Sequence, residues 1–116
     1  MTAADVAARA LAAVDGDEAE VLVQSERSGL ARFAGSVQHQ PTLTENVVAT
    51  LRVVRDGRVG VAVTNRTSDD GLRALAQRAG EVAVSSPLDE HFPGLPTPAP
   101  VPDVDGYDEE TAALGP

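Results

Sequence analysis

The fold is decided by residues 46–65, NVVATLRVVRDGRVGVAVTN, in which two valine-rich runs flank Asp56-Gly57. Asp-Gly is the pair that a two-residue type I′ turn favours, so this stretch predicts an antiparallel β-hairpin. In the register that this turn sets, Val54 lies opposite Val59 and Val53 lies opposite Gly60. The next pairs in the same register are Arg52 with Val61, Leu51 with Ala62 and Thr50 with Val63.

The predicted hairpin has two apolar faces. One face is low in profile and suits a closely packed helix, and it carries Val53, Gly60, Leu51, Ala62 and Ala49. The other face is bulkier, and it carries Val54, Val59, Val61, Val63, Thr50 and Arg52. The solvent-facing side of an antiparallel sheet is normally polar. We therefore expect the bulkier face to be covered, either within the domain or by something that this chain does not contain.

The chain before the hairpin predicts a helix followed by extended segments. Residues 2–14 begin with Thr2 as N-cap and Asp5 as its capping-box partner, and Asp15-Gly16 ends the helix. From residue 20 onward apolar and polar residues alternate, and Ser28-Gly29 indicates a turn. The segments 30–35 and 37–40 continue as extended chain, with Gly35-Ser36 as a bulge or kink and Pro41 at a strand edge or end.

A second helix is predicted over residues 68–84, after the hairpin. Thr67 is its predicted cap and Ser85-Ser86-Pro87 its end, while Gly71 and Gly80 are interpreted as points of close packing. Its apolar stripe consists of Leu72, Leu75, Ala76, Ala79 and Val82. The predicted fold is α+β, with an antiparallel four-stranded sheet of open strand order and both helices on one face.

Composition changes sharply after residue 86, which sets the predicted domain boundaries. Residues 1–86 form an α-β-β-β-β-α domain, residues 87–107 a proline-rich linker, and residues 108–116 the start of a truncated further helix. The tail is acidic as well as proline-rich. An unfinished helix after a linker suggests a piece of a longer protein.

Charge and composition exclude several functions. Nine basic residues, all arginine, against 18 acidic residues give a net charge of −9, which argues against binding to nucleic acid or an anionic membrane surface. Cysteine is absent, so thiolate chemistry is excluded. His39 and His91 lack the spacing of a zinc-binding pair, and Asp89 with His91 is a weak metal candidate because it flanks a proline-rich loop. We assign no catalytic, cofactor-binding or metal-binding residue.

The chain resembles the N-terminal domain of the TldD/PmbA (TldD/TldE) family. The resemblance rests on RFAGSVQHQ at residues 32–40 and VVRDGRVGVAVTN at residues 53–65, together with AEVLV at residues 19–23 and FPGLP at residues 92–96. The order of these segments matches the family over essentially the whole chain. The resemblance implies a bacterial protein related to zinc metallopeptidases that act in proteolysis or peptide-precursor processing. We expect a cytoplasmic location, because the sequence has no apolar stretch long enough to cross a bilayer and no signal-peptide pattern at its start.

What the resemblance implies for this chain is a non-catalytic role. In the family, the zinc-binding motif lies downstream of this domain, so zinc is expected only in the full-length protein or its partner subunit, and no cofactor in this chain. The implied partners are the remainder of its own chain, a second TldD/PmbA-type subunit and a peptide substrate. The candidate docking face consists of Arg52, Val54, Val59, Val61 and Val63. The alternative is a free-standing α+β protein-binding module without peptidase activity.

Overall fold

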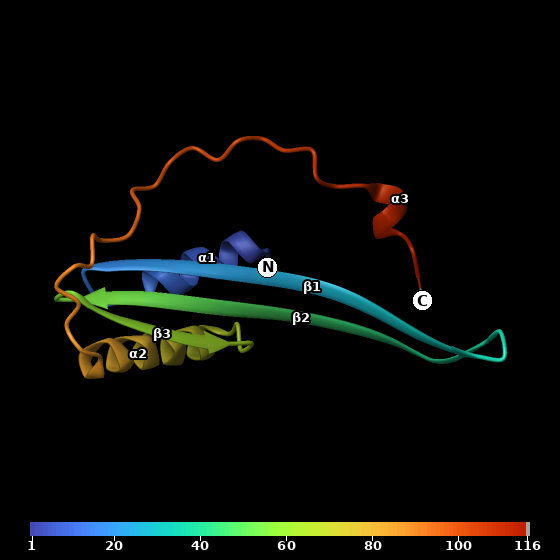
Figure 1. The fold of residues 1–116 in the computed structure, drawn as a ribbon, viewed down its shortest axis with the longest axis horizontal. Coiled ribbons are helices and arrows are strands. Elements are labelled where there is room, and N and C mark those ends of the chain that lie inside the picture. Colours follow the sequence, from blue (N-terminus) through green and yellow to red (C-terminus); the bar gives the residue numbers. More distant parts are fainter. Residues whose placement is uncertain (116) are drawn as a thin grey trace. The chain divides into compact units, whose positions relative to one another are not determined.

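The computed structural model describes residues 1–115 and has an α+β fold, as predicted (Figure 1). In chain order its elements are α1 (Ala3–Ala12), β1 (Glu18–Ala34), β2 (Val37–Arg55), β3 (Arg58–Thr64), α2 (Asp69–Ser85) and α3 (Glu109–Ala112). The chain divides into two units. The first unit comprises Met1–Ser25 and Asn46–Pro96, and the second comprises Glu26–Glu45 with the described part of residues 97–116. Pro116, the last residue of the predicted truncated helix, lies outside the described residues.

The sheet within residues 1–115 has three strands in the order β1-β2-β3, so the prediction of four strands is wrong. The error lies in the turn that was expected at Ser28-Gly29, because β1 runs through this pair without interruption. The chain reverses instead at Gly35 and Ser36, whose φ angles of 58° and 63° are both positive. Two consecutive positive φ angles are typical of a type I′ turn, so Gly35-Ser36 is a hairpin turn rather than a bulge.

Strand β2 continues through Pro41, which was expected at a strand edge or end. Proline cannot donate a ladder hydrogen bond, and irregular positions accommodate it within a strand. Gln40, the residue before Pro41, has a φ of 48°, outside the extended region. The proline therefore follows a local irregularity in the strand.

The hairpin of β2 and β3 has the predicted register. Val54 pairs with Val59 and Val53 pairs with Gly60, and all other predicted pairs are present. Asp56 and Gly57 form the turn with φ angles of 49° and 71°. The Asp-Gly pair thus fixes which face of each strand is turned toward the core.

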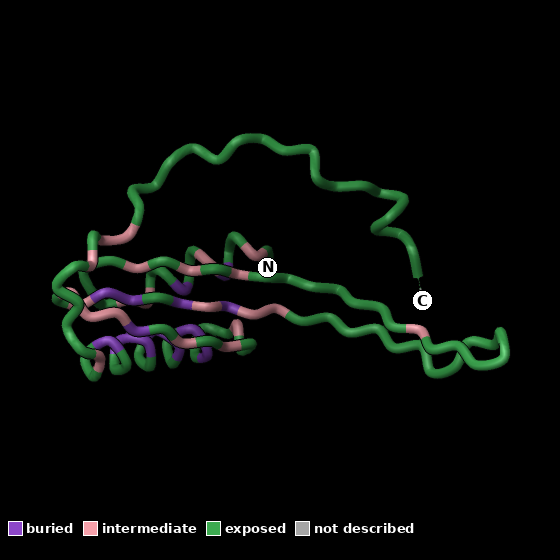
Figure 2. The backbone as a smooth tube through the Cα atoms, viewed as in Figure 1, coloured by how far each residue is buried: buried purple, intermediate pink, exposed green. Residues whose placement is uncertain are grey.

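The core of the first unit lies between one face of the strands and both helices (Figure 2). Ala49, Leu51 and Val53 of β2 form a single buried cluster with Val6 and Ala10 of α1. The same cluster includes, from α2, Leu72, Leu75, Ala76 and Ala79. Ala19, Val21 and Val23 of β1 pack against it. This arrangement leaves the opposite face of the strands free of both helices.

Helix α2 differs from its prediction at two positions. Its N-cap is Ser68 rather than Thr67, because the Ser68 side chain accepts a hydrogen bond from the Gly71 amide at 3.1 Å. Val82 was predicted in the buried stripe, but it is 45% exposed, and Ala83 is buried instead. A helical period of 3.6 residues, counted from Leu72, places the last buried position at Ala83. The prediction of Val82 was therefore wrong by one residue.

The glycines Gly71 and Gly80 of α2 do mark close packing. A Cβ on Gly71 would lie 2.8 Å from the Cβ of Arg66, and a Cβ on Gly80 would lie 3.1 Å from Nη2 of Arg55.

None of the helices in residues 1–115 is long and apolar enough to cross a bilayer.

Helix α1 begins with the predicted capping box. The Asp5 amide donates to the Thr2 hydroxyl at 3.1 Å, and the Thr2 amide donates to the Asp5 carboxylate at 2.8 Å. Hydrogen bonds from the backbone and side chain of Thr2 hold the pKa of Asp5 below its ordinary value of 3.8. Because the pKa of Asp5 is lower in the folded state than in the unfolded state, the capping box contributes its full stabilisation at pH values above the unfolded-state pKa. That contribution is lost as the pH falls through the folded-state pKa.

We expect Thr2→Val to raise the pKa of Asp5 toward 3.8, because valine removes the hydroxyl donor to the carboxylate. An NMR titration of the Asp5 carboxyl carbon measures this pKa directly. Arg9→Gln is the control, since the charge of Arg9 is the smallest of the causes that lower this pKa. An equal rise in the two variants would contradict the assignment of the shift to the capping box.

Candidate functional site

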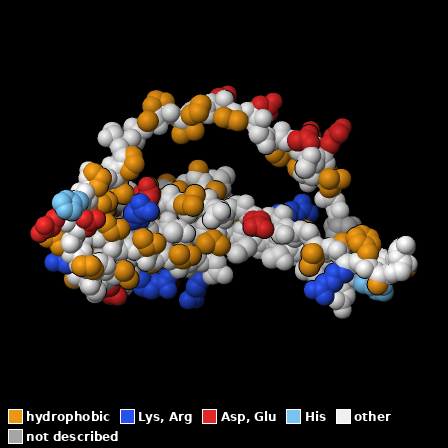
Figure 3. Space-filling model, viewed as in Figure 1, with side chains coloured by type: hydrophobic (Ala, Val, Ile, Leu, Met, Phe, Trp, Pro, Cys, Tyr) orange, Lys and Arg blue, Asp and Glu red, His pale blue; other side chains and the backbone are white. Residues whose placement is uncertain are grey.

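The candidate site is the face of the first unit's strands that is turned away from both helices. We call it the outer face and define it by Glu20, Leu22, Thr50, Arg52, Val54, Val59, Val61 and Val63. The β2–β3 register places all five predicted docking residues on this face. On β2 they alternate with Leu51 and Val53 of the buried cluster, and on β3 they alternate with Gly60 and Ala62. The space-filling view shows hydrophobic side chains gathered over the strands of this unit (Figure 3).

Exposure increases along the outer face, away from the Asp56-Gly57 turn. Val54 is only 4% exposed and Val59 is half-buried. By contrast, Val61 is 46% exposed and Val63 is 54% exposed. From the sequence these valines were expected to be equally exposed. In the structure the valines near the turn are covered and those farther away are exposed.

The segment that follows α2 is attached at the covered end. The Asp89 amide donates to the carbonyl of Gly57 at 3.2 Å. Farther along, the Leu95 amide donates to the Glu18 carboxylate at 2.6 Å. Residues 88–95, which fall in the predicted linker, are thus tied both to the hairpin turn and to the start of β1. No local sequence pattern indicates these contacts, because the partners are remote in the chain.

An ion pair crosses the open end of the outer face. Nη1 of Arg52 lies 3.2 Å from Oε1 of Glu20, with each side chain about half exposed at 46% and 47%. A hollow of about 420 Å³ surrounds the pair, and it is lined by Glu20, Val21, Leu22, Thr50, Arg52 and Val61. An exposed pair of this kind contributes only about 0–1 kcal/mol to stability. The two opposite charges of the pair cancel on this apolar face.

Leu22 belongs to the outer face but was not among the predicted docking residues. It lies on β1 and is 57% exposed, more than either Val61 or Val63. The alternating pattern of β1 could have placed Leu22 on this face. Ala19, Val21 and Val23 pack against the core, so the even-numbered residues between them point away from it. The pairing of β1 with β2 brings Leu22 and Arg52 to one hollow.

The structure was searched for side chains that could together hold a metal ion. Within residues 1–115, no group of three or more His, Cys, Asp or Glu side chains is placed to hold a metal ion. Asp89 accepts a hydrogen bond from the His91 amide at 3.0 Å, which is a local turn contact rather than a shared ligand site. His39 lies in β2, within the second unit. Zinc therefore does not fit the residues described, and we derive no chemical step through it.

Comparison with known proteins identifies the family. A family model described as "PmbA/TldA metallopeptidase domain 1" matches residues 19–83, which is more than half of this 116-residue chain. This chain belongs to the PmbA/TldD family. The PmbA/TldD match begins in β1 and ends in α2, so it includes every residue of the outer face.

A solved PmbA/TldD-type structure has the same fold. The crystal structure of TldE from Thermococcus kodakarensis superposes with a TM-score of 0.75 over 92% of this chain, at 18% sequence identity. The chain spans 24% of the length of that TldE chain. At this level of identity the similarity concerns the fold alone. No curated protein matches the sequence.

Proposed function

We propose that this chain is the N-terminal, non-catalytic assembly and substrate-positioning domain of a TldD/PmbA-type metallopeptidase. The observation that carries the proposal is the outer face, where Leu22, Val61 and Val63 are each about half exposed. The opposite side of the same strands is packed against both helices. A domain with one packed and one uncovered apolar sheet face is suited to docking.

The proposed occupant of the outer face is the remainder of the same polypeptide or a second TldD/PmbA-type subunit. The family match and the TldE likeness support a domain of a larger assembly, since this chain spans 24% of the TldE chain. Zinc and the peptide substrate are assigned to that assembly, which we place in the bacterial cytoplasm. The role of this domain is to hold its partner through apolar contact, with Arg52 and Glu20 keeping the interface neutral.

We expect Val61→Asp combined with Val63→Asp to weaken association with a second PmbA/TldD-type subunit from the same genome at least about a hundredfold. The reason is that burying an unpaired carboxylate in an apolar interface costs several kcal/mol. The measurement is the dissociation constant of the two purified proteins, with light scattering to give the mass of the complex. Thermal unfolding of the variant alone verifies that the domain still folds.

The matched control is Val82→Asp with Val84→Asp, which places the same charges on two valines of α2 that are 45% and 61% exposed. This control is expected to retain association, because α2 lies on the other side of the strands. Equal weakening by both variants would overturn the assignment of the outer face. A native gene product near 12.0 kDa that binds no family subunit would favour a free-standing binding module.

A further inference from the structure

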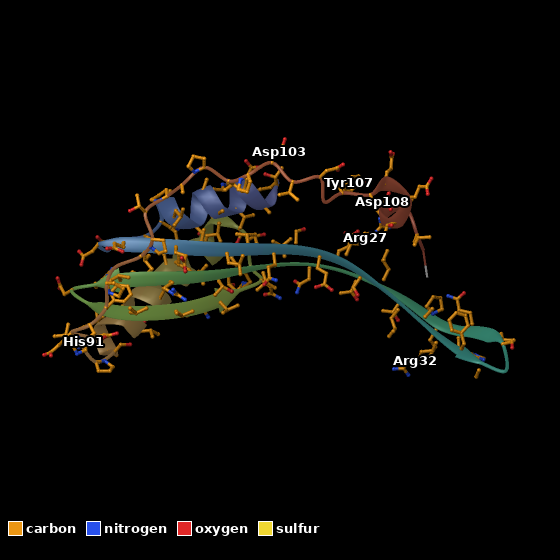
Figure 4. The ribbon with its side chains drawn as sticks, turned by 45° about the horizontal axis from the view of Figure 1, so that its top comes forward. Arg27, Arg32, His91, Asp103, Tyr107 and Asp108 are labelled. Atoms are coloured by element: carbon orange, nitrogen blue, oxygen red, sulfur yellow. The ribbon has the colours of Figure 1, made fainter. Side chains whose placement is uncertain are left out.

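Residues 88–95 lie at one end of the first unit, and we call this segment the strap. Figure 4 shows His91, in the middle of the strap, at the same end of the unit as the β2–β3 turn. Phe92 and Leu95 are half-buried, whereas His91 and Pro93 between and beside them are exposed. Burial of the apolar side chains alone is typical of a segment that packs on a surface rather than of a solvated linker.

The two hydrogen bonds that anchor the strap both lie close to Val54. At one end the Asp89 amide donates to the carbonyl of Gly57, which follows Val54 by three residues in the same hairpin. At the other end the Leu95 amide donates to the Glu18 carboxylate at 2.6 Å. The residue before Glu18 donates its own amide to the carbonyl of Val54 at 3.0 Å, so Glu18 lies beside Val54.

The burial of Val54 has to come from the outer face. Val54 is only 4% exposed, yet it does not belong to the buried cluster that joins Val53 to both helices. The side chain of Glu18 points to the outer face as well, because the next residue, Ala19, packs against that cluster. The strap is therefore anchored on the same side of the sheet as the valine that is buried without the cluster.

The closed position of the strap depends on a glycine. Gly94 has a φ of 91°, a conformation that residues with a side chain rarely adopt. A Cβ at Gly94 would also lie 3.2 Å from Oε1 of Glu18, the atom pair that carries the second anchor. Two hydrogen bonds and two half-buried side chains hold the strap, and segments with so few contacts open locally while the rest of a domain stays folded.

We propose that the strap is a releasable, autoinhibitory cover of the outer face at the end nearest the hairpin turn. In its closed position it covers Val54 and Val59. Its release exposes them, so that the uncovered surface extends from Val61 and Val63 to the turn. The consequence for docking rests on the proposed function, since a partner that occupies the whole outer face must first displace the strap.

The test uses the full chain, which has no native cysteine, so that a single Val54→Cys substitution supplies the only thiol. The rate of alkylation by iodoacetamide is followed by intact mass. Adding Gly94→Val is expected to raise this rate at least about tenfold, because a β-branched residue is strained at a φ of 91° and opposes closure. Leu95→Pro removes the amide donor to Glu18 and is expected to act in the same direction.

Two controls separate release of the strap from other effects. Gly106→Val adds the same side chain where a Cβ meets nothing within 4 Å, and it is expected to leave the rate at position 54 unchanged. Leu51→Cys, used in place of Val54→Cys, puts the thiol in the buried cluster, where it is expected to stay protected in the Gly94→Val chain. An unchanged rate at position 54 in both strap variants would overturn the proposal. Equal acceleration at position 51 would overturn it too, because the strap would then be part of the domain's own core.

Competition between the strap and a partner is measured separately. We expect Gly94→Val, with Val54 retained, to tighten association with a second PmbA/TldD-type subunit about threefold or more, since the partner no longer has to displace the strap. Equal or weaker association would overturn the competition. Failure of every variant to associate would overturn the proposed function instead, while the alkylation rates still decide whether the strap covers Val54.

Discussion

Gly60→Ala is expected to destabilise the domain by about 3 kcal/mol, the upper range for overpacking a close contact. Gly60 of β3 is buried and faces α2. A Cβ added there would lie 2.9 Å from Cα of Ala83 and closer still to the carbonyl oxygen of Ala79. These are backbone atoms of a helix, so they cannot rotate away as a side chain would. The helix must therefore shift away from the strand.

Thermal unfolding followed by circular dichroism measures this effect. For a domain of this size, a loss of about 3 kcal/mol lowers Tm by at least about 10 °C. Gly106→Ala is the control, because an added Cβ at Gly106 meets nothing within 4 Å and Gly106 does not have a positive φ. A similar small change in Tm for both variants would show that β3 and α2 are not in close contact.

The hairpin of β2 and β3 could be predicted from sequence because its determinants are local. Asp56-Gly57 supplies two residues that tolerate positive φ, and the flanking valines alternate with a period of two. Turn type then fixes the register, and the register fixes which side chains share a face. The register places Arg52, Val54, Val59, Val61 and Val63 on one face, and their role as a docking face stays a prediction.

The long hairpin of β1 and β2 could not be predicted in the same way. These strands have 17 and 19 residues, well beyond the usual strand length. A sequence of that length containing Ser28-Gly29 and Pro41 is naturally divided at those positions. The actual turn has serine at positive φ, which is uncommon for this residue. This division gave the predicted sheet one strand more than the structure has.

The coverage of Val54 had no signal in the sequence. Val54 lies near the Asp56-Gly57 turn, to which residues 88–95 are attached through the hydrogen bond from the Asp89 amide to the Gly57 carbonyl. Backbone contacts of this kind do not depend on a distinctive residue pattern. The extent of the exposed part of the outer face, which begins beyond Val59, is therefore visible only in the structure.

Leu51→Ala is expected to cost about 3 kcal/mol, within the range for a buried leucine that leaves a cavity. Leu51 of β2 is fully buried in the cluster that joins both helices to the strands. Its neighbours in that cluster include Ala10, Ala76 and Ala79. Alanines have no side chain that could turn into the space, so the cavity is expected to persist.

Urea unfolding of Leu51→Ala measures this loss, and Leu22→Ala on the adjacent strand is its matched control. Leu22 is 57% exposed on the outer face, so its truncation is expected to change the free energy of unfolding by less than about 1 kcal/mol. Leu22→Ala is instead expected to weaken association with the proposed partner, in a domain that remains folded. If Leu22→Ala instead lowers the stability of the isolated chain as much as Leu51→Ala does, the outer face is part of the domain's own core. Its assignment as a docking surface would then be wrong.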